Sequence, residues 1–286
     1  MRHDTVLTDC WGYHIRPIHY YEPLPDFGAI TAAQLERRRE FPAINFDWPG
    51  QLRLLAALAA EYRDELAELA AQPEPVGFPF DNEYFAGLDA AVYYALIRHL
   101  KPARVVEIGS GYSTRIAAKA LARNRQAGNP GRLTCIEPYP QPRLTEAKLD
   151  IELITTPVEQ LDLAMFSTLA PNDILFIDSS HTVKFGSDVC YEFLEILPQL
   201  RAGVWVHVHD IFFPHDYPAD WVLGKRIAFN EQYLLEAFLT YNDAFTVVAA
   251  NHWLSLDYPE AAECLWPGIQ RDSFNGHASF WMRKTG

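Results

Sequence analysis

Short apolar runs alternate with helix-compatible segments along the chain from about residue 103 onward. The helix-compatible segments include STRIAAKALARN and SDVCYEFLEILPQL. Strands that are apolar on both faces, and that alternate with helices, are typical of a parallel sheet covered by helices on both sides. Five runs predict parallel strands: ARVVEIG (103–109), RLTCIEP (132–138), IELITTP (151–157), DILFIDSS (173–180) and GVWVHVHD (203–210).

Two further apolar runs, AFTVVAAN (244–251) and ASFWMRK (278–284), have no helical pattern of the same kind between them. Such a pair is typical of antiparallel strands at the edge of a sheet. The whole pattern therefore predicts an α/β fold, with a doubly wound, seven-stranded, mostly parallel sheet.

The beginning of the chain has a different character. Residues 1–30 are rich in Pro, Tyr and His and show no periodicity, which predicts an irregular arm. Thr31 and Gln34 have the spacing of a capping box, so we expect a short helix to begin there.

Apolar positions at helical spacing predict two longer helices, over about 49–71 and 86–100. We therefore expect an N-terminal arm and helical extension over 1–84, and one larger domain over 85–286. Aromatic residues are dense in the arm, just before residue 86, and in IFFPHDYPADW (211–221). These aromatic residues predict either a lid over a substrate or packing of the added helices.

The composition and charge narrow the range of partners. With 49% hydrophobic and 21% charged residues, the chain has enough apolar material for the full core of a globular protein. The formal net charge of −13 repels phosphate backbones and anionic lipid. We therefore expect neither nucleic acid nor membrane as a partner.

The cysteines and the N-terminal residues indicate in which cellular compartment the protein is expected. Cys10, Cys135, Cys190 and Cys264 show no CxxC spacing, and Cys135 and Cys190 lie within apolar elements, which predicts reduced, buried thiols. The first residues lack the apolar region of a signal peptide, and no apolar stretch of about 18 residues occurs. The expected location is the cytoplasm.

The turn after the first strand of the sheet is the first candidate binding element. In a doubly wound sheet, ligands bind beyond the carboxyl ends of the strands. Gly109 and Gly111 let the backbone approach a ligand closely, and Ser113 follows at the start of a helix, where free N–H groups are available. The second strand ends in Glu137, an acid that can accept both hydroxyls of a ribose. A tight turn without a ligand, and a surface acid, are the alternatives.

Glu107 separates two kinds of nucleotide site. A dinucleotide brings its pyrophosphate to this turn, and an acid two residues before Gly109 repels it. The E-x-G-x-G pattern also lacks the third glycine of a dinucleotide site. An acid here suits a cationic ligand, such as adenosine joined to an amino acid with a charged ammonium and sulfonium.

Taken in order, VVEIGSGYST, CIEP, DILFIDSSHT, HVHDIFFP and SFWMRK resemble the class I S-adenosylmethionine-dependent methyltransferases, over residues 85–286. The resemblance implies S-adenosylmethionine as the cofactor and the strand order 3-2-1-4-5-7-6, with strand seven antiparallel. It places the methionine part at the turn, the ribose at the second strand end and the adenine near 157–159. The implied cofactor-binding residues are Glu107, Gly109, Ser110, Gly111, Ser113, Thr114, Glu137, Pro138, Val158 and Asp178.

Catalytic groups are expected at the ends of the fourth and fifth strands. Asp178 and His181 end the fourth strand, and His209 and Asp210 end the fifth. Strand alternation puts His207 and His209 on one face and turns Asp210 to the other face or into the loop. A histidine of near-neutral pKa can remove a proton from the methyl acceptor, so His181 is the candidate general base, with His209 and Asp210 beside it. A structural histidine bonded to a carboxylate is the alternative.

Asp178, His209 and Asp210 form an alternative metal site. Carboxylates at these strand ends could hold Mg²⁺ or another divalent ion, which lowers the pKa of an acceptor hydroxyl. Some similar O-methyltransferases use magnesium in this way, although one position here is histidine rather than aspartate. If this site binds no metal, we expect Asp210 to cap a loop or to contact the substrate.

The leading functional hypothesis is O-methylation of a small molecule, such as a sugar or a secondary metabolite. The alternatives are N-methylation of a small molecule, a nicotinamide-dependent oxidoreductase, and a catalytically silent subunit that binds S-adenosylmethionine. The sequence does not identify the acceptor or the oligomeric state, and a homodimer stays open.

Overall fold

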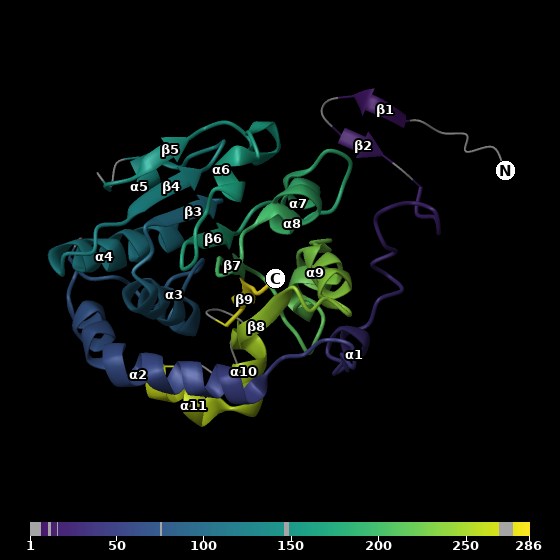
Figure 1. The fold of residues 1–286 in the computed structure, drawn as a ribbon. Helices are drawn as coiled ribbons and strands as arrows, with labels where there is room; N and C mark the ends of the chain where they lie inside the picture. The colour runs from purple at the N-terminus through teal and green to yellow at the C-terminus, as the bar shows by residue number, and fades with distance from the viewer. Residues whose placement is uncertain (1–6, 11–12, 16, 75, 146–148, 269–276) are drawn as a thin grey trace.

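The computed structural model describes residues 7–10, 13–15, 17–74, 76–145, 149–268 and 277–286. Its central element is a seven-stranded sheet in the order β5-β4-β3-β6-β7-β9-β8, in which only β9 runs antiparallel to its neighbours (Figure 1). This arrangement confirms the predicted strand order. The strands are β3 (Arg104–Ile108), β4 (Arg132–Ile136), β5 (Glu152–Ile154), β6 (Ile174–Ile177), β7 (Trp205–Val208), β8 (Phe245–Ala250) and β9 (Phe280–Lys284).

The central parallel strands end at the same level. Ile108 of β3 pairs with both Ile136 of β4 and Ile177 of β6, and Ile177 pairs with Val208 of β7. The residues that follow these four positions therefore meet at one edge of the sheet. Every residue that the sequence analysis proposed for catalysis follows β6 or β7 at this edge.

Helices cover both faces of the sheet (Figure 1). On one face, Phe176 lies in a buried cluster with side chains of α2, α3, α4 and α11; on the other face, Leu175 packs with α7 and α9. The helices are α1 (Ala32–Leu35), α2 (Trp48–Ala71), α3 (Gly87–Leu100), α4 (Tyr112–Gln126), α5 (Pro142–Thr145), α6 (Ala164–Ser167), α7 (Asp188–Tyr191), α8 (Leu197–Gln199), α9 (Glu231–Leu239), α10 (Asn251–Asp257) and α11 (Pro259–Leu265); Val158–Gln160 is 3₁₀-helical, and Glu192–Ile196 and Asp220–Gly224 are π-helical.

The N-terminal helices follow their sequence signals. The capping box of Thr31 and Gln34 is present at α1, and α2 and α3 lie close to their predicted ranges. Leu58 of α2 is fully buried in the same cluster as α3 and α4, because one apolar stripe of the helix faces the sheet. The division of the chain at residue 84 stays a prediction.

Three expectations were wrong in detail. The arm contains two short antiparallel strands, β1 (Leu7–Cys10) and β2 (Tyr13–Ile15), which are too short to show a period. Helices α10 and α11 lie between β8 and β9; Pro259 separates them into pieces of seven residues, so neither gives a long helical pattern. Cys190 is partly exposed and Cys264 is exposed, whereas Cys135 is buried as expected.

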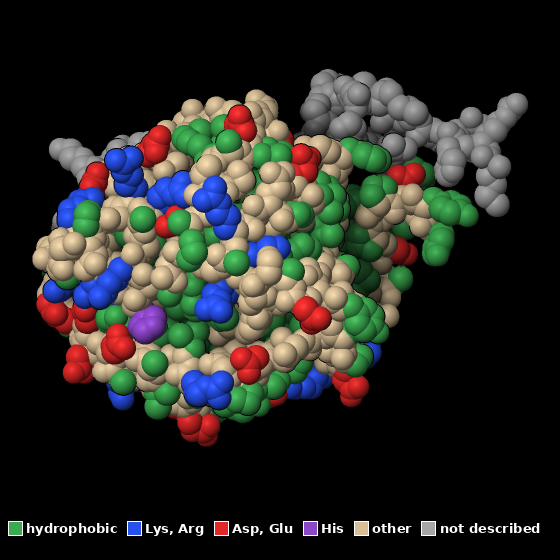
Figure 2. All heavy atoms as spheres, viewed as in Figure 1, with side chains coloured by type: hydrophobic (Ala, Val, Ile, Leu, Met, Phe, Trp, Pro, Cys, Tyr) green, Lys and Arg blue, Asp and Glu red, His purple; other side chains and the backbone are tan. Residues whose placement is uncertain are grey.

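Charged side chains are mixed over the surface. On the face shown in Figure 2, basic and acidic side chains are interspersed. Among the described residues, no helix combines the length and the apolar character that a crossing of a bilayer requires.

Candidate active site

The turn between β3 and α4 requires glycine at position 109. Gly109 has a φ of 80°, and a Cβ at this position would lie 1.8 Å from the carbonyl oxygen of Asp178. Its N–H donates to the carbonyl of Ile136 at 2.9 Å, so the turn is tied to the ends of both neighbouring strands. Glycine is the residue that combines this backbone conformation with such a close approach.

Glu107 lies beneath this turn, and its side chain is fully buried. Its carboxylate accepts hydrogen bonds from the hydroxyls of Thr114 (2.6 Å) and Tyr93 (3.2 Å). Burial raises the pKa of Glu107 to about 7, although these hydroxyl donors act to lower it. Strand alternation directs the side chain toward α3 and α4, so Glu107 supports the turn from below rather than lining the adjacent cavity.

A cavity of about 370 Å³ lies beside the turn, at the carboxyl ends of β3, β4 and β6. Glu137 lines it, and its carboxylate accepts from the backbone N–H groups of Ser110 (3.2 Å) and Tyr139 (2.9 Å). This size and position suit a nucleoside ligand at the point where the strand order reverses. Of the predicted cofactor-binding residues, the lining includes Gly109, Glu137, Pro138, Val158 and Asp178, and it omits Glu107, Ser110, Gly111, Ser113 and Thr114.

The sequence analysis missed part of this lining. Ser179 and Ser180 follow Asp178 directly, and Ser180 donates to Asp188 at the start of α7. The run DSSH already marked this strand end, so its two serines were the available signal. Lys184 also lines the cavity, and no motif marks it.

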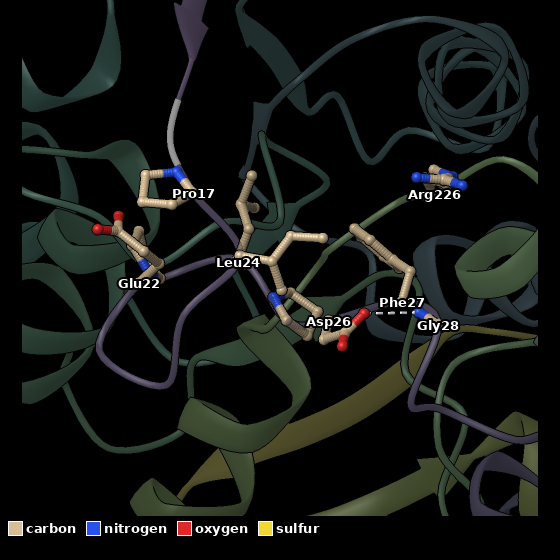
Figure 3. Close-up of a pocket in the computed structure, with 10 residues that line it drawn as sticks. Pro17, Glu22, Leu24, Asp26, Phe27, Gly28 and Arg226 are labelled. Carbon is tan, nitrogen blue, oxygen red and sulfur yellow. Dashed lines mark hydrogen bonds between the residues drawn. The ribbon is translucent and has the colours of Figure 1, made fainter. Parts of the chain in front are cut away.

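A larger cavity, of about 640 Å³, lies elsewhere (Figure 3). The arm over residues 17–28 lines it together with Arg226, whose guanidinium lies 5.9 Å from the ring centre of Phe27. No strand-end residue contributes to it, so it lies apart from the edge of the sheet that carries the turn and the two histidines. The smaller cavity is therefore the cofactor candidate.

His181 is surrounded by three carboxylates at the carboxyl edge of the sheet. Its Nδ1 lies 2.8 Å from Oε2 of Glu231, and its Nε2 lies 3.3 Å from Asp178 and 3.4 Å from Asp210. Both His181 and Asp210 have positive φ angles, of 56° and 55°, which are uncommon for residues other than glycine. Such conformations cluster at functional sites, where the surrounding structure holds them.

His209 approaches the same two aspartates from the other side. Its Nδ1 lies 3.4 Å from Oδ1 of Asp178 and 3.5 Å from Oδ1 of Asp210, and its Nε2 lies 3.6 Å from Asp89 of α3. The structure thus brings together all four residues proposed at these strand ends. It adds Asp89 and Glu231, which no motif indicated.

The electrostatics of this cluster are dominated by opposite charges in a buried setting. Burial acts to lower the pKa of both His181 and His209, but the surrounding carboxylates outweigh it and hold both values well above the usual range. Burial acts to raise the pKa of Asp178, yet the two histidines hold it well below its usual value. For Asp210, burial prevails and its pKa is raised.

His207 has a different role from His209, although the two rings are stacked with their centroids 5.6 Å apart, in agreement with the prediction that they share one face. Its ring stacks on Phe176 with the centroids 3.8 Å apart, and its Nε2 lies 2.8 Å from the hydroxyl of Ser279. Burial and the charge of His209 hold its pKa well below the usual value, so the imidazole is neutral. His207 is therefore part of the packed core beneath the cluster.

The cluster has the donor set of a divalent-cation site. One ligand atom from each of Asp178, His181 and Asp210 lies within 4.8 Å of the others. Carboxylate and imidazole groups with this spacing suit several divalent metals. The set shares two residues with the predicted one, and it contains His181 where the sequence analysis expected His209.

Comparison with known proteins agrees with this geometry. A family profile described as "Methyltransferase domain" matches residues 106–211, a segment that carries the turn after β3 and the four cluster residues that follow β6 and β7. Residues 106–211 therefore carry a methyltransferase domain, in agreement with the resemblance to the class I S-adenosylmethionine-dependent methyltransferases. The match supports a methyltransferase that takes S-adenosylmethionine as its methyl donor, and it disfavours the oxidoreductase alternative.

Three individual proteins are similar to this chain, at sequence identities from 14% to 33%. An uncharacterized protein of Archaeoglobus fulgidus is 33% identical over 170 residues, which cover 55% of this chain and 75% of that protein. The O-methyltransferase TomG from Streptomyces achromogenes, solved with S-adenosylmethionine, is 18% identical with a TM-score of 0.41, over 86% of this chain and 93% of TomG. An O-methyltransferase from Bacillus cereus, solved with S-adenosylhomocysteine, is 14% identical with a TM-score of 0.43, over 83% and 91% of the two chains.

Proposed function

We propose that this methyltransferase methylates a hydroxyl oxygen of a small molecule, with His181 as the general base. The observation that carries the proposal is the position of His181, whose Nε2 lies 3.3 Å from Asp178, a residue that also lines the cofactor cavity. A proton acceptor at the rim of that cavity is what an O-methyl transfer needs, because an alcohol must lose its proton as its oxygen is alkylated.

The residues around the cavity have separate tasks in this proposal. Bound S-adenosylmethionine supplies an electrophilic methyl group on a sulfonium. The turn at Gly109 and the carboxylate of Glu137 hold the cofactor, the latter through the ribose hydroxyls. His181 would accept the proton of the acceptor hydroxyl at Nε2 as that oxygen is methylated. Glu231, 2.8 Å from Nδ1, then stabilises the imidazolium that has formed.

A divalent cation, such as Mg²⁺, is a second part of the proposal. The six side chains of the cluster include four carboxylates, on Asp89, Asp178, Asp210 and Glu231, but only two imidazoles. Asp178 and Asp210 are partly exposed, and the other four residues are buried. Even with both imidazoles protonated, four ionised carboxylates leave an excess of negative charge, which a cation would offset. Asp178 and Asp210 would hold it, with His209 or His181 as the third ligand. Such a cation lowers the pKa of a hydroxyl bound to it.

The two roles of His181 exclude each other, and variants separate them. If His181 is the base, His181→Gln leaves Mg²⁺ or Mn²⁺ affinity, measured by calorimetry, close to that of the native protein. In that case His209→Gln weakens it. If His181 is instead a metal ligand, His181→Gln weakens the affinity for Mg²⁺ or Mn²⁺ and His209→Gln leaves it close to the native value. That result would overturn the assignment of His181 as the general base.

The reaction itself is tested with S-adenosylmethionine labelled in its methyl group. Matched panels of small alcohols, sugars, phenols and amines are offered at saturating cofactor, and labelled products are identified by mass spectrometry. We expect label on oxygen, with turnover reduced at least about 100-fold in His181→Gln. Label on nitrogen alone, or full turnover in the variant, would overturn the proposal.

A further inference from the structure

The two histidines of the cluster are held in parallel ways, by carboxylates on their outer sides. Each imidazole presents one nitrogen to the inner pair, Asp178 and Asp210. Its other nitrogen faces a buried carboxylate from a different part of the fold, Glu231 for His181 and Asp89 for His209. Both outer carboxylates belong to helices, α9 and α3, that flank the sheet edge.

Glu231 holds His181 through both main chain and side chain. It is the first residue of α9 and is 1% exposed. Its backbone N–H and that of Asn230 donate to the carbonyl of His181, at 3.2 and 3.0 Å, while its carboxylate meets Nδ1 at 2.8 Å. The start of α9 therefore fixes the position of residue 181 and the rotation of its ring. The other carboxylate oxygen, Oε1, has no hydrogen-bond partner among the described residues, so this carboxylate serves the imidazole.

Asp89 is fixed by three donors from the C-terminal part of the chain, at the start of α10 and just before β9. Its Oδ1 accepts from the side-chain amide of Asn251 (2.8 Å) and the backbone N–H of Ser279 (3.0 Å), and its Oδ2 accepts from the N–H of Ala278 (2.7 Å). These three donors set the carboxylate independently of His209, whose Nε2 lies 3.6 Å away. At this distance the contact is an ion pair rather than a hydrogen bond. Asp89 thus gives His209 a rigid, charged partner.

We infer that Glu231 and Asp89 are positioning residues, which fix the orientation and the protonated nitrogen of His181 and His209 and so direct the opposite nitrogen at Asp178 and Asp210. A carboxylate on the outer nitrogen of a catalytic or metal-binding histidine has this effect in general, because it selects one tautomer and one ring orientation. The kinetic consequence rests on the proposed role of His181, whereas the tautomer itself does not.

The test therefore begins with a measurement that needs no turnover. Long-range ¹H–¹⁵N spectra of the histidine rings, recorded at an alkaline pH at which both imidazoles are neutral, report which nitrogen carries the proton. The signals are assigned with His181→Gln and His209→Gln. We expect Glu231→Gln to change the Nδ1 signal of His181 and Asp89→Asn to change the Nε2 signal of His209. Asp173→Asn is the matched control, because Asp173 is equally buried and accepts three hydrogen bonds at the opposite end of β6.

Turnover is then measured at saturating cofactor. We expect Glu231→Gln to lower kcat about 10- to 100-fold with the KM for S-adenosylmethionine nearly unchanged. Asp89→Asn should have a smaller effect, because its contact with His209 is longer. In a His181→Gln background, Glu231→Gln should add little, since it acts through that ring.

Each outcome bears on the inference in a defined way. Unchanged ring signals in both variants would overturn it, whatever the rates. Changed ring signals with unaltered kcat would support the positioning and count against the proposed general base instead. If Glu231→Gln does not fold, Glu231→Asp keeps the charge at a greater distance, and a native Nδ1 signal in that variant would also contradict the inference.

Discussion

The carbonyl oxygen of Asp178 occupies the place where a side chain at Gly109 would begin, 1.8 Å from the position of a Cβ. The turn after β3 and the strand end after β6, to which we assign cofactor binding and catalysis, are therefore in direct backbone contact. A side chain at residue 109 would therefore displace the turn after β3, the end of β6, or both.

Gly109→Ala should abolish cofactor binding, because the methyl group displaces either the turn or the end of β6. Gly128→Ala is the matched control: Gly128 has a similar φ of 83°, but nothing lies within 4 Å of its Cβ position. The control should lose only about 1 kcal/mol of stability and keep its affinity. Calorimetric titration with S-adenosylmethionine measures both variants, and similar affinities for the two would contradict the steric argument.

Glu137→Gln should weaken S-adenosylmethionine binding about 10- to 100-fold, since a hydrogen bond to a charged acceptor is worth roughly 1.5–3 kcal/mol. Glu152 on the neighbouring strand β5 is exposed and bonds only Thr134 among the described residues, so Glu152→Gln serves as the control. Equal affinities of the two variants would place the ribose elsewhere.

Methyl transfer should increase with pH across the neutral and mildly alkaline range. Burial lowers the pKa of His181, but hydrogen bonds to Asp178 and Glu231 outweigh this effect and raise it well above the usual value. The free enzyme therefore carries a protonated imidazole near neutrality, and activity appears as the proton is lost. A profile of kcat/KM should show an ascending limb above the ordinary histidine pKa of about 6.5. A profile that falls over this range would exclude His181 as the base.

Glu107 should make the folded state less stable as the pH rises from about 4.5 to about 7. Burial raises the pKa of this carboxyl to about 7 from its ordinary 4.5, so the folded protein binds its proton more tightly than the unfolded chain does. Below about 4.5 both states are protonated and no cost arises, whereas above about 7 both are ionised and the full cost, on the order of 3 kcal/mol, is present.

The variant Glu107→Gln carries no such charge. Its stability relative to the native protein should therefore be greater at about pH 8 than at about pH 5, which urea denaturation at the two pH values measures. Identical pH dependence in the two proteins would show that Glu107 is not the group responsible.

The sequence was sufficient to predict the sheet and its edge, because that information is local. Each strand is a short apolar run, and the residues just after β6 and β7 carry the polar groups. The positions of Asp89 and Glu231 could not be predicted in this way. Asp89 lies on a buried helix with no motif around it, and its partner Ser279 is 190 positions away along the chain. Only the packed fold brings them together.

Two other differences between the prediction and the structure also arise from features that the local sequence pattern does not reveal. The acid at Glu107 indicates the correct class of cofactor, but strand alternation turns its side chain toward Tyr93 and away from the cavity. Helices α10 and α11 are short and interrupted by Pro259, so their periodicity is weak although both are packed against the sheet or α2.

The anchoring of Asp89 also sets an order of events during synthesis. Two of its three hydrogen-bond donors, the N–H groups of Ala278 and Ser279, lie 189 and 190 positions after it. A nascent chain can form the central parallel strands long before these residues leave the ribosome. The carboxylate of Asp89 can be fully satisfied only after β9 inserts between β7 and β8, a pairing of high contact order that forms slowly. Assembly of the His209 side of the cluster is thus a late step, and a chain stalled before β9 would fold in part without a competent site.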